Sequence, residues 1–342
     1  MNRPRIGVLV AVACAVMALV AAGCGSSSSN SSSSSAGSGP NHSNIKIGLV
    51  TDIGGLNDHG FNHLAYLGLQ RAQSQLGVSI RVLQSTQNSD YVPNLQTLAA
   101  QHYNLIIAVG FLMGDAVKQV AAAYPSEHFA IIDFTYAPHN IKNVQGLLFK
   151  EQDSGYLAGY LAGLVTKTGK VSTVGGQKIP PVDHYIAGFQ AGAKASHPGI
   201  QLQNAYSASF TDQSKCEQLA LNQINSGSDV VFQVAGACGL GALTAAKQKN
   251  VWGIGVDADQ SYLGSYILTS AEKKVDVAVF DTIKDVVDGK QVGGGDSIFD
   301  ATNGGTGLGK ISPKVPAADL TKLKAVEQKM NAGQINPPDT VP

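Results

Sequence analysis

The sequence has little charge and no excess of either sign. Lys and Arg together number 24, Asp and Glu also number 24, and charged residues make up 14% of the 342 residues. A protein that binds nucleic acid needs a basic stripe or patch to neutralise phosphates. The chain has no such stripe, so its composition argues against a nucleic acid as partner.

Long apolar runs are also lacking after the N-terminal leader. The best candidate, residues 156–165, covers about ten residues and contains glycines, whereas a membrane-spanning helix needs about 20 apolar residues. About 300 residues remain after the leader, enough for two domains with full hydrophobic cores. Neither a structural metal nor a disulfide framework is needed to hold such a chain together.

The leader itself has the pattern of a secretory signal peptide over residues 1–23. Arg3 and Arg5 precede an apolar run at 6–22, and small residues then lead into Cys24. A signal anchor is the alternative, because a run of about 17 residues reaches the lower end of the spanning range. The cysteine after small residues resembles the lipobox of bacterial lipoproteins. That resemblance implies cleavage before Cys24, a diacylglycerol on its thiol and an acylated new N-terminus.

Residues 24–44 consist, after the cysteine, mostly of Ser, Gly and Asn. A segment of this composition cannot bury apolar surface, so we expect a flexible tether. The predicted product is a soluble body anchored by lipid to the cell membrane on its extracytoplasmic side.

Cysteines are few, four in the whole chain. Cys14 is removed with the leader and Cys24 takes the lipid, which leaves Cys216 and Cys238. An even pair in an exported protein predicts a disulfide; two free buried thiols are the alternative. No histidines lie nearby in the sequence to complete a metal site, so we predict none.

From residue 45 onward, short β-branched runs alternate with helical patterns, and this alternation predicts an α/β fold with parallel sheets covered on both faces. The chain changes character near residue 140, which favours two sheets. The expected strands are 45–51, Ser79–Leu83, 105–109, 129–133, Val144–Phe149, 171–174, Gln201–Tyr206, Val230–Val234 and 253–256. The expected helices are Phe61–Leu76, 93–102, 114–124, 153–168, 184–196, 212–226 and 240–249.

Several enzyme and metal motifs are missing or incomplete. Neither a GxSxG elbow nor an SxxK pair occurs, and residues 304–311 imitate a phosphate-binding loop but carry Ile311 where Ser or Thr is required. Ser312-Pro313 then prevents the helix that would bind the anion, so we interpret this segment as a turn. His59 and His63 have the spacing of a zinc pair but no third ligand, and a solvated helix face is the expected alternative.

Polar or glycine residues directly follow five of the expected strands. Ligands of open parallel sheets bind outside the carboxyl ends of the strands. Each of these residues could instead cap the next helix, but together they predict one ligand cleft. They are Asp52, Gly110, Asp133, Gly236 and Asp257.

The loop at residues 51–62 offers the widest range of contacts. Its glycines allow close approach of a ligand, Asp52 and Asn62 offer hydrogen bonds, and Phe61 offers a flat apolar face. Phe61 could instead be a core residue that starts the helix. A calcium site on Asp52 and Asp58 is the enzyme-like alternative, but two carboxylates fall short of the six or more oxygens that calcium takes.

Taken together, eight segments in order resemble the basic membrane protein family, also called the purine nucleoside receptor family. The resemblance runs from about residue 45 to about residue 309. It implies an ABC transporter substrate-binding lipoprotein with a type I periplasmic-binding fold, in which two doubly wound lobes are joined by a three-strand hinge. The segments are TDIGGLNDHGFN (51–62), FAIIDF (129–134), FKEQDSGYLAGYLAG (149–163), VGGQKIP (174–180), AGFQAGAK (187–194), SFTD (209–212), GIGVDADQ (253–260) and LTSAEKKVD (268–276).

The resemblance also implies roles for particular residues. Phe61 matches an aromatic residue that stacks on a purine, with Asp52 and Asn62 at the base edge, and Phe210 is the candidate for the second aromatic. Asp133, Asp257 and Lys273 match groups that hold the ribose. The implied first lobe is 45–140 with about 260–290, and the second is about 141–259 with 291–342.

The resulting hypothesis is a monomeric capture protein, without cofactor or catalysis, that delivers a purine nucleoside to an ABC permease in the membrane. Three alternatives stay open. They are a receptor for a sugar or other polar ligand in the same fold, a nucleoside-cleaving enzyme, and a surface adhesin or signalling lipoprotein.

Overall fold

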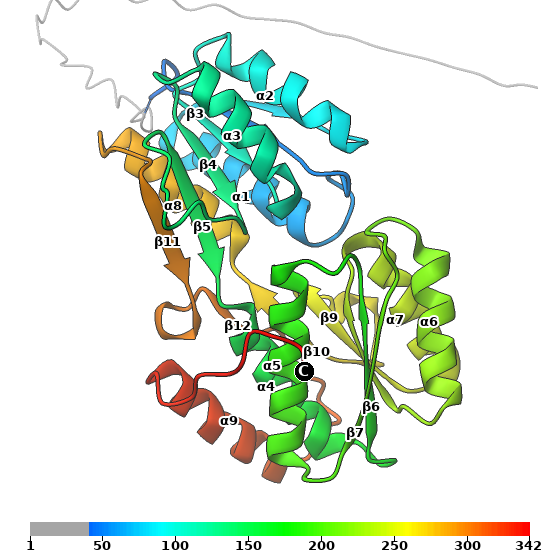
Figure 1. Ribbon diagram of the computed structural model, residues 1–342. Helices are drawn as coiled ribbons and strands as arrows, with labels where there is room; N and C mark the ends of the chain where they lie inside the picture. Colours follow the sequence, from blue (N-terminus) through cyan, green and yellow to red (C-terminus); the bar gives the residue numbers. More distant parts are fainter. Residues whose placement is uncertain (1–40) are drawn as a thin grey trace, which may run out of the picture. The chain divides into compact units, whose positions relative to one another are not determined.

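The computed structural model describes residues 41–342, which contain two six-stranded sheets (Figure 1). The first has the order β11-β5-β4-β3-β1-β2 and the second the order β12-β10-β9-β8-β6-β7. Every strand pair is parallel except β10 with β12. The predicted α/β class with two parallel-dominated sheets is therefore confirmed. The predicted signal peptide, Cys24 and most of the tether lie outside the described residues.

The strands are those expected up to residue 257, with ends shifted by no more than one residue. In the first sheet they are β1 (Lys46–Val50), β2 (Ser79–Leu83), β3 (Leu105–Ala108), β4 (Phe129–Ile132), β5 (Val144–Phe149) and β11 (Gly295–Phe299). In the second they are β6 (Lys170–Gly175), β7 (Gln201–Tyr206), β8 (Val230–Val234), β9 (Trp252–Asp257), β10 (Ile267–Lys273) and β12 (Thr306–Leu308). Strands β3, β4 and β8 are buried along their whole length, as strands covered on both faces should be.

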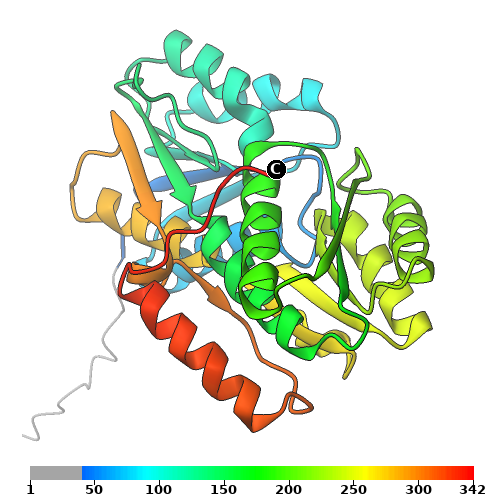
Figure 2. The same cartoon turned by 60° about the horizontal axis from the view of Figure 1, so that its bottom comes forward.

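Helices cover the faces of each sheet and share its core. With the first sheet lie α1 (Phe61–Leu76), α2 (Tyr91–Ala99), α3 (Gly114–Ala123) and α8 (Val275–Val287). With the second lie α4 (Glu151–Val165), α5 (Pro180–Ser196), α6 (Gln213–Asn225), α7 (Gly239–Lys249) and α9 (Ala317–Asn331). Figure 2 shows α9, in red, next to α4.

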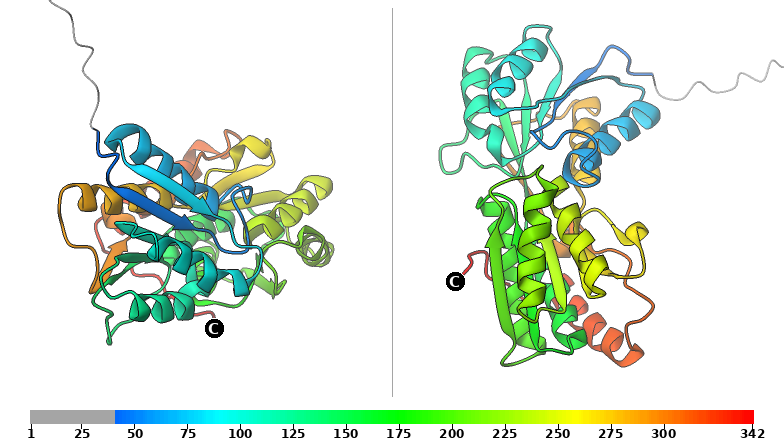
Figure 3. Two further views of the ribbon diagram at one scale, coloured as in Figure 1. Left: turned by 90° about the horizontal axis from the view of Figure 1, so that it is seen from above. Right: turned by 90° about the vertical axis from the view of Figure 1, so that its right-hand side faces the viewer.

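The chain crosses between the sheets after β5, after β10 and after β11 (Figure 3). The crossings are hydrogen-bonded to one another: Lys150 N donates to Phe299 O at 2.9 Å, and Lys274 N donates to Gly305 O at 2.9 Å. An ion pair between Lys150 Nζ and Asp300 Oδ2 at 3.0 Å links the first and third crossings. These contacts make the expected three-segment hinge.

The sheet memberships differ from the segments assigned to the lobes in two places. We assigned residues 260–290 to the first lobe, but β10 pairs with β9 in the second sheet, and only α8 packs on the first. We assigned 291–342 to the second, but β11 pairs with β5 in the first sheet. The reason is that β10 and β11 each run up to a crossing, and local sequence pattern does not say which sheet a strand joins.

Beyond residue 257 the sequence pattern did not identify β10, α8, β11, β12 or α9 as elements. The segment at 304–311 contains the short edge strand β12 and is followed by no helix until Ala317. The interpretation of this segment as a turn was therefore wrong for Thr306–Leu308, which pair with β10 as an edge strand.

A stripe of small residues joins α4 to α5. Gly155 and Gly159 leave no room for a side chain against the backbones of Tyr185 and Phe189, and Gly192 on α5 meets the backbone of Tyr156 in the same way. The stripe therefore serves close helix packing inside the second lobe. Within residues 41–342, we find no helix with the length and apolar character to cross a membrane.

The predicted disulfide is confirmed. Cys216, in the first turn of α6, is bonded to Cys238 in the short 3-10 helix η3 (Gly236–Cys238), with Cα atoms 5.6 Å apart. Both residues are fully buried.

Candidate functional site

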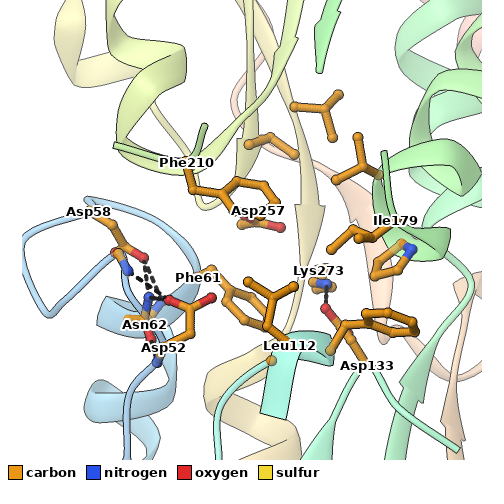
Figure 4. Close-up of a pocket in the computed structure, with 18 of the residues that line it drawn as sticks. Asp52, Asp58, Phe61, Asn62, Leu112, Asp133, Ile179, Phe210, Asp257 and Lys273 are labelled. Carbon is orange, nitrogen blue, oxygen red and sulfur yellow. Dashed lines mark hydrogen bonds and ion pairs between the residues drawn. The ribbon is translucent and has the colours of Figure 1, made fainter. Parts of the chain in front are cut away.

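A cavity is lined by residues of both lobes (Figure 4). Every residue predicted to contact a ligand lines it. These residues are Asp52, Phe61, Asn62, Gly110, Asp133, Phe210, Gly236, Asp257 and Lys273.

The topology explains why residues so far apart in the sequence meet here. Asp52 follows β1, Gly110 follows β3 and Asp133 follows β4; Gly236 follows β8, and Asp257 is the last residue of β9. All are at the carboxyl ends of parallel strands, where open α/β sheets bind their ligands.

Two of these carboxylates share an unusual backbone conformation. Asp133 has φ 67° and Asp257 has φ 64°, both in the left-handed region that non-glycine residues seldom adopt. The two positions are equivalent in the two sheets. Asp133 lies at the carboxyl end of β4, the fourth strand counted from β2, and Asp257 lies at the carboxyl end of β9, the fourth strand counted from β7. Backbone strain of this kind is concentrated at binding sites.

At one end of the cavity, Asn62 is bonded to two carboxylates. Its Nδ2 donates to Asp52 Oδ1 at 2.7 Å and to Asp58 Oδ2 at 3.0 Å, and its Oδ1 accepts from Asp52 N at 3.1 Å. Asn62 thus has protein partners on both polar side-chain atoms and fixes the orientation of Asp52. In the described part of the chain, no protein donor is bonded to Asp52 Oδ2, whereas Oδ1 accepts from Gly54 N and Asn62 Nδ2.

Asp58 binds the amino end of α1. Its carboxylate accepts from the backbone N–H groups of Gly60, Asn62 and His63, at 3.0, 2.7 and 3.1 Å. A carboxylate here satisfies amides that the helix leaves unpaired. Asp58 is a helix cap, and the residues from 41 onward contain no cluster of side chains suited to a metal ion.

Two aromatic rings project into the cavity, Phe61 from the first lobe and Phe210 from the second (Figure 4). Each ring rests against a glycine. A Cβ at Gly110 would lie 3.2 Å from the ring of Phe61, and a Cβ at Gly176 would collide with the ring of Phe210. Glycine at these two positions therefore makes space for the rings.

At the other end of the cavity, Lys273 is surrounded by carboxylates. Its Nζ donates to Asp133 Oδ2 at 2.6 Å and to Glu151 Oε1 at 3.2 Å, and the Lys273 side chain is only 2% exposed. Glu151 Oε2 is 3.0 Å from His184 Nδ1 on α5. The ammonium also lies 4.6 Å from the centre of the Phe61 ring.

The charge states follow from burial and from these partners. Burial lowers the pKa of Lys273, but the surrounding carboxylates of Asp133, Glu151 and Asp257 outweigh it and hold this pKa above its usual value. Burial opposes ionisation of Glu151 as well, yet Lys273 and His184 keep its pKa below the ordinary value. The ammonium and the Glu151 carboxylate are thus ionised near neutral pH.

Three other carboxyl groups are harder to ionise. Burial raises the pKa of Asp52 and of Asp257 to about 6, and burial also raises that of Asp133, against the opposing effect of Lys273. Asp257 Oδ1 accepts from Tyr185 Oη at 3.2 Å. Asp133 Oδ1 is buried and has no partner in the described chain, an arrangement that is costly unless a ligand supplies a donor.

The sequence analysis missed several lining or supporting residues. Glu151 and Tyr185 lie within or beside segments quoted for the resemblance, but neither position has a local signal of its role. The aliphatic wall also went unnoticed, because its members look like ordinary core residues. It consists of Leu112, Ile179, Pro181, Val182, Val234 and Val256.

Comparison with known proteins agrees with this geometry. Residues 45–340 match the model of a family described as "ABC transporter substrate-binding protein PnrA-like". The "CD4+ T-cell-stimulating antigen" of Listeria monocytogenes is 35% identical, over 86% of this chain and 88% of that protein. The "ABC transporter nucleoside-binding protein BmpA" of Lactococcus lactis is 35% identical, over 78% of this chain and 82% of its own length.

Further relatives are named basic membrane proteins and lipoproteins. Among solved structures, an ABC transporter solute-binding protein from Aeropyrum pernix superposes with a TM-score of 0.79 at 27% identity, covering 85% of this chain and 92% of that one. The type I periplasmic-binding fold is thereby established, and the chain belongs to the PnrA-like family of ABC transporter substrate-binding proteins.

Proposed function

We propose that the protein captures a purine nucleoside between its lobes and releases it intact to the permease of an ABC transporter. Membership of the family implies a small-molecule ligand and a permease partner. The choice of a nucleoside depends on one observation, the combination of an aromatic pair with a buried lysine–carboxylate cluster in a single cavity.

The aromatic pair suits a flat base. Phe61 and Phe210 come from opposite lobes, and the ring of each packs against a glycine and faces the cavity. Stacking on aromatic rings is favourable for any purine. The free oxygen of Asp52 would accept an N–H group at the base edge.

The lysine–carboxylate cluster suits the ribose. Asp133 Oδ1 is buried and lacks a partner among the described residues, so a sugar hydroxyl would satisfy it. Asp257 and Lys273 line the same end of the cavity. Sites built around such groups reject analogues without the hydroxyls, because the buried oxygens would remain unpaired.

Two further parts of the proposal concern location and assembly. The leader and Cys24 suit a lipid anchor on the extracytoplasmic face of the cell membrane, with residues 25–44 as a tether. Replacing Cys24 with Ala should release the protein into the medium or periplasm of a bacterial host, and membrane retention would contradict the anchor. We propose a monomer, because the cavity is complete within one chain.

Incubation with adenosine, guanosine and inosine tests the function directly. We expect saturable binding by calorimetry, with a dissociation constant near or below about 1 μM, and full recovery of the nucleoside by chromatography. Release of base and ribose would instead support an enzyme. Binding of free sugars with no binding of nucleosides would support a sugar receptor.

Mass spectrometry of ligand released from protein purified without added nucleoside provides an independent test. Recovery of a purine nucleoside is the expected result. A different polar molecule, at one copy per chain, would contradict the proposed ligand while leaving capture by the cleft intact.

A further inference from the structure

The ring of Phe210 belongs to a short segment suspended between two elements of the second lobe. The backbone oxygen of Phe210 accepts from Cys238 N in η3 at 2.9 Å. Two residues further on, Asp212 caps α6, and its side chain accepts from Lys215 N at 3.3 Å. The position of the ring therefore depends on η3 and α6 staying together.

The disulfide joins these same two elements. Cys216 is in the first turn of α6, and Cys238 ends η3, directly after the cavity-lining residues Gly236 and Ala237. Both cysteines are fully buried. The bond thus lies immediately behind the cavity wall made by Phe210 and η3.

At this corner of the lobe the large apolar side chains of α6, Leu219, Leu221 and Ile224, are only partly buried. The local core cluster consists almost entirely of small side chains, whereas the main core of the same lobe contains Phe189, Phe232 and several leucines. Small side chains bury little apolar area and so contribute little hydrophobic stabilisation. The members of the small cluster are Val174, Cys216, Ala220, Val231, Ala235, Cys238, Ala242 and Ala245.

We infer that the Cys216–Cys238 disulfide is a brace that holds the wall formed by Phe210 and Gly236 in its ligand-binding position, so that ligand affinity depends on the redox state of this pair. The two cysteines are positioning residues, because neither lines the cavity. The ligand part of the inference rests on the proposed nucleoside function; the mechanical part concerns the second lobe alone.

Loss of the bond should act by local opening. Because the large side chains of α6 that pack here, Leu219, Leu221 and Ile224, are only partly buried, we expect α6 to separate from η3 without unfolding of the rest of the lobe. The ring of Phe210 would then be ordered only when ligand binds, and this added ordering cost weakens binding. The effect should be seen mainly as faster ligand dissociation.

The first test compares the variant Cys216→Ala/Cys238→Ala with the oxidised wild type. Calorimetry with inosine, guanosine and adenosine should show about tenfold weaker binding in the variant. The matched control is Leu323→Ala, in α9, where Leu323 is 3% exposed and does not line the cavity. This control should lose stability yet bind as the wild type does; equal weakening in both would overturn the inference.

Hydrogen exchange on the ligand-free proteins tests the mechanical part without any ligand. Amides of residues 207–216 and 236–245 should exchange about fivefold or more faster in the double variant, while those of α4 and α5 should not change. Unchanged exchange in those two segments, or equal acceleration across the whole second lobe, would overturn the brace. If the wild type binds none of the nucleosides, the proposed function fails, but the hydrogen-exchange result still decides whether the disulfide braces the wall of the second lobe.

Two additional measurements make the test sharper. If the bond acts through Phe210, the affinity losses of Phe210→Ala and of the double cysteine variant should not add when combined; full additivity would contradict it. Should the double variant not fold, the wild type can be reduced with dithiothreitol. The disulfide takes two electrons and two protons as the reagent closes to its own cyclic disulfide, and the same exchange pattern is expected.

Discussion

The two lobes share one strand order, with β12 antiparallel where β11 is parallel, and they differ in what they bring to the cavity. From one sheet edge, β2-β1-β3-β4-β5-β11 corresponds to β7-β6-β8-β9-β10-β12, and short 3-10 helices follow both β3 and β8. The first lobe contributes Asp52, Asp58 and Asp133. The second contributes most of the aliphatic wall and one carboxylate, Asp257.

This difference separates two tasks that binding requires. Polar groups of the first lobe and of the crossing at Lys273 are held in place by the protein's own hydrogen bonds, so they are preorganised for recognition. Under the proposed function, the apolar wall of the second lobe would exclude water from a bound ligand, and this would strengthen each of those polar contacts.

Removal of the charge at the crossing should have the largest effect. Lys273→Met removes the charged partner of the buried Asp133 carboxylate and leaves Glu151 paired with His184 alone, and we expect a loss of about 3–5 kcal/mol in unfolding free energy. Nucleoside affinity should fall by at least about a hundredfold. Chemical denaturation and calorimetry measure the two effects.

The neighbouring Lys274 provides the control for that experiment. Its side chain is 41% exposed and pairs only with Glu272, so Lys274→Met should change stability by about 1 kcal/mol or less. Similar losses in both variants would show that the cluster at Lys273 has no special role.

Asp257 is the one carboxylate that the second lobe supplies to the cavity. Asp257→Ala should abolish the preference for ribosides over free bases, a change of about a hundredfold in the ratio of dissociation constants, because a buried acceptor for the sugar is lost. Parallel titrations with inosine and hypoxanthine measure this ratio. A preference that survives would refute the assignment of Asp257 to the ribose.

The two aromatic rings allow a direct comparison of the lobes. Phe61→Ala and Phe210→Ala should each weaken nucleoside binding by about tenfold or more without unfolding the protein. Substitution by Leu, which keeps apolar volume but not the flat face, should recover only part of the loss. Unchanged affinity in either Ala variant would exclude stacking on that ring.

The smallest predicted effect is a dependence of stability on pH. The pKa values of Asp52 and Asp257 are raised by burial to about 6 in the folded protein. The stabilisation by a carboxyl group with a raised pKa is complete below its pKa in the unfolded chain. It is lost as the pH rises through the pKa of the same group in the folded protein. Ligand-free protein should therefore gain about 1 kcal/mol for each group between pH 7 and pH 5.

Other titrating groups do not reverse this predicted gain in stability between pH 7 and pH 5. The raised pKa of His184 acts in the same direction, and the lowered pKa of Glu151 costs stability only at lower pH. The variant Asp52→Asn/Asp257→Asn should flatten the profile of unfolding free energy against pH. A wild-type profile that falls from pH 7 to pH 5 would contradict the burial argument.

Much of the fold could be predicted because its signals are local. Continuous β-branched runs gave strands at nearly every predicted position up to residue 257, and Gly77, in the left-handed conformation at φ 72°, ends α1 as expected. The prediction became less reliable after that point. The strand β11 alternates between half-buried and exposed residues, so it lacks the long apolar run that identified the others.

The candidate site also contains residues that could be predicted from local sequence and residues that could not. Residues that follow strands could be found from the sequence, because the topology of a parallel sheet collects them at one edge. Asn62 was predicted to meet the ligand and it lines the cavity, and the folded chain also uses its amide to orient Asp52. Glu151 and Tyr185 have no local signal, since each acts only through a partner far away in the chain.

The sequence by itself therefore determined the fold class, the order of most elements and the set of residues at the strand ends, since these depend on local periodicity. The tertiary structure decided which sheet receives β10 and β11, and which side chains surround Lys273. The bond from Lys273 to Asp133 spans 140 residues and the bond to Glu151 spans 122. Contacts at such separations depend on how the two lobes pack, and no short stretch of sequence encodes that packing.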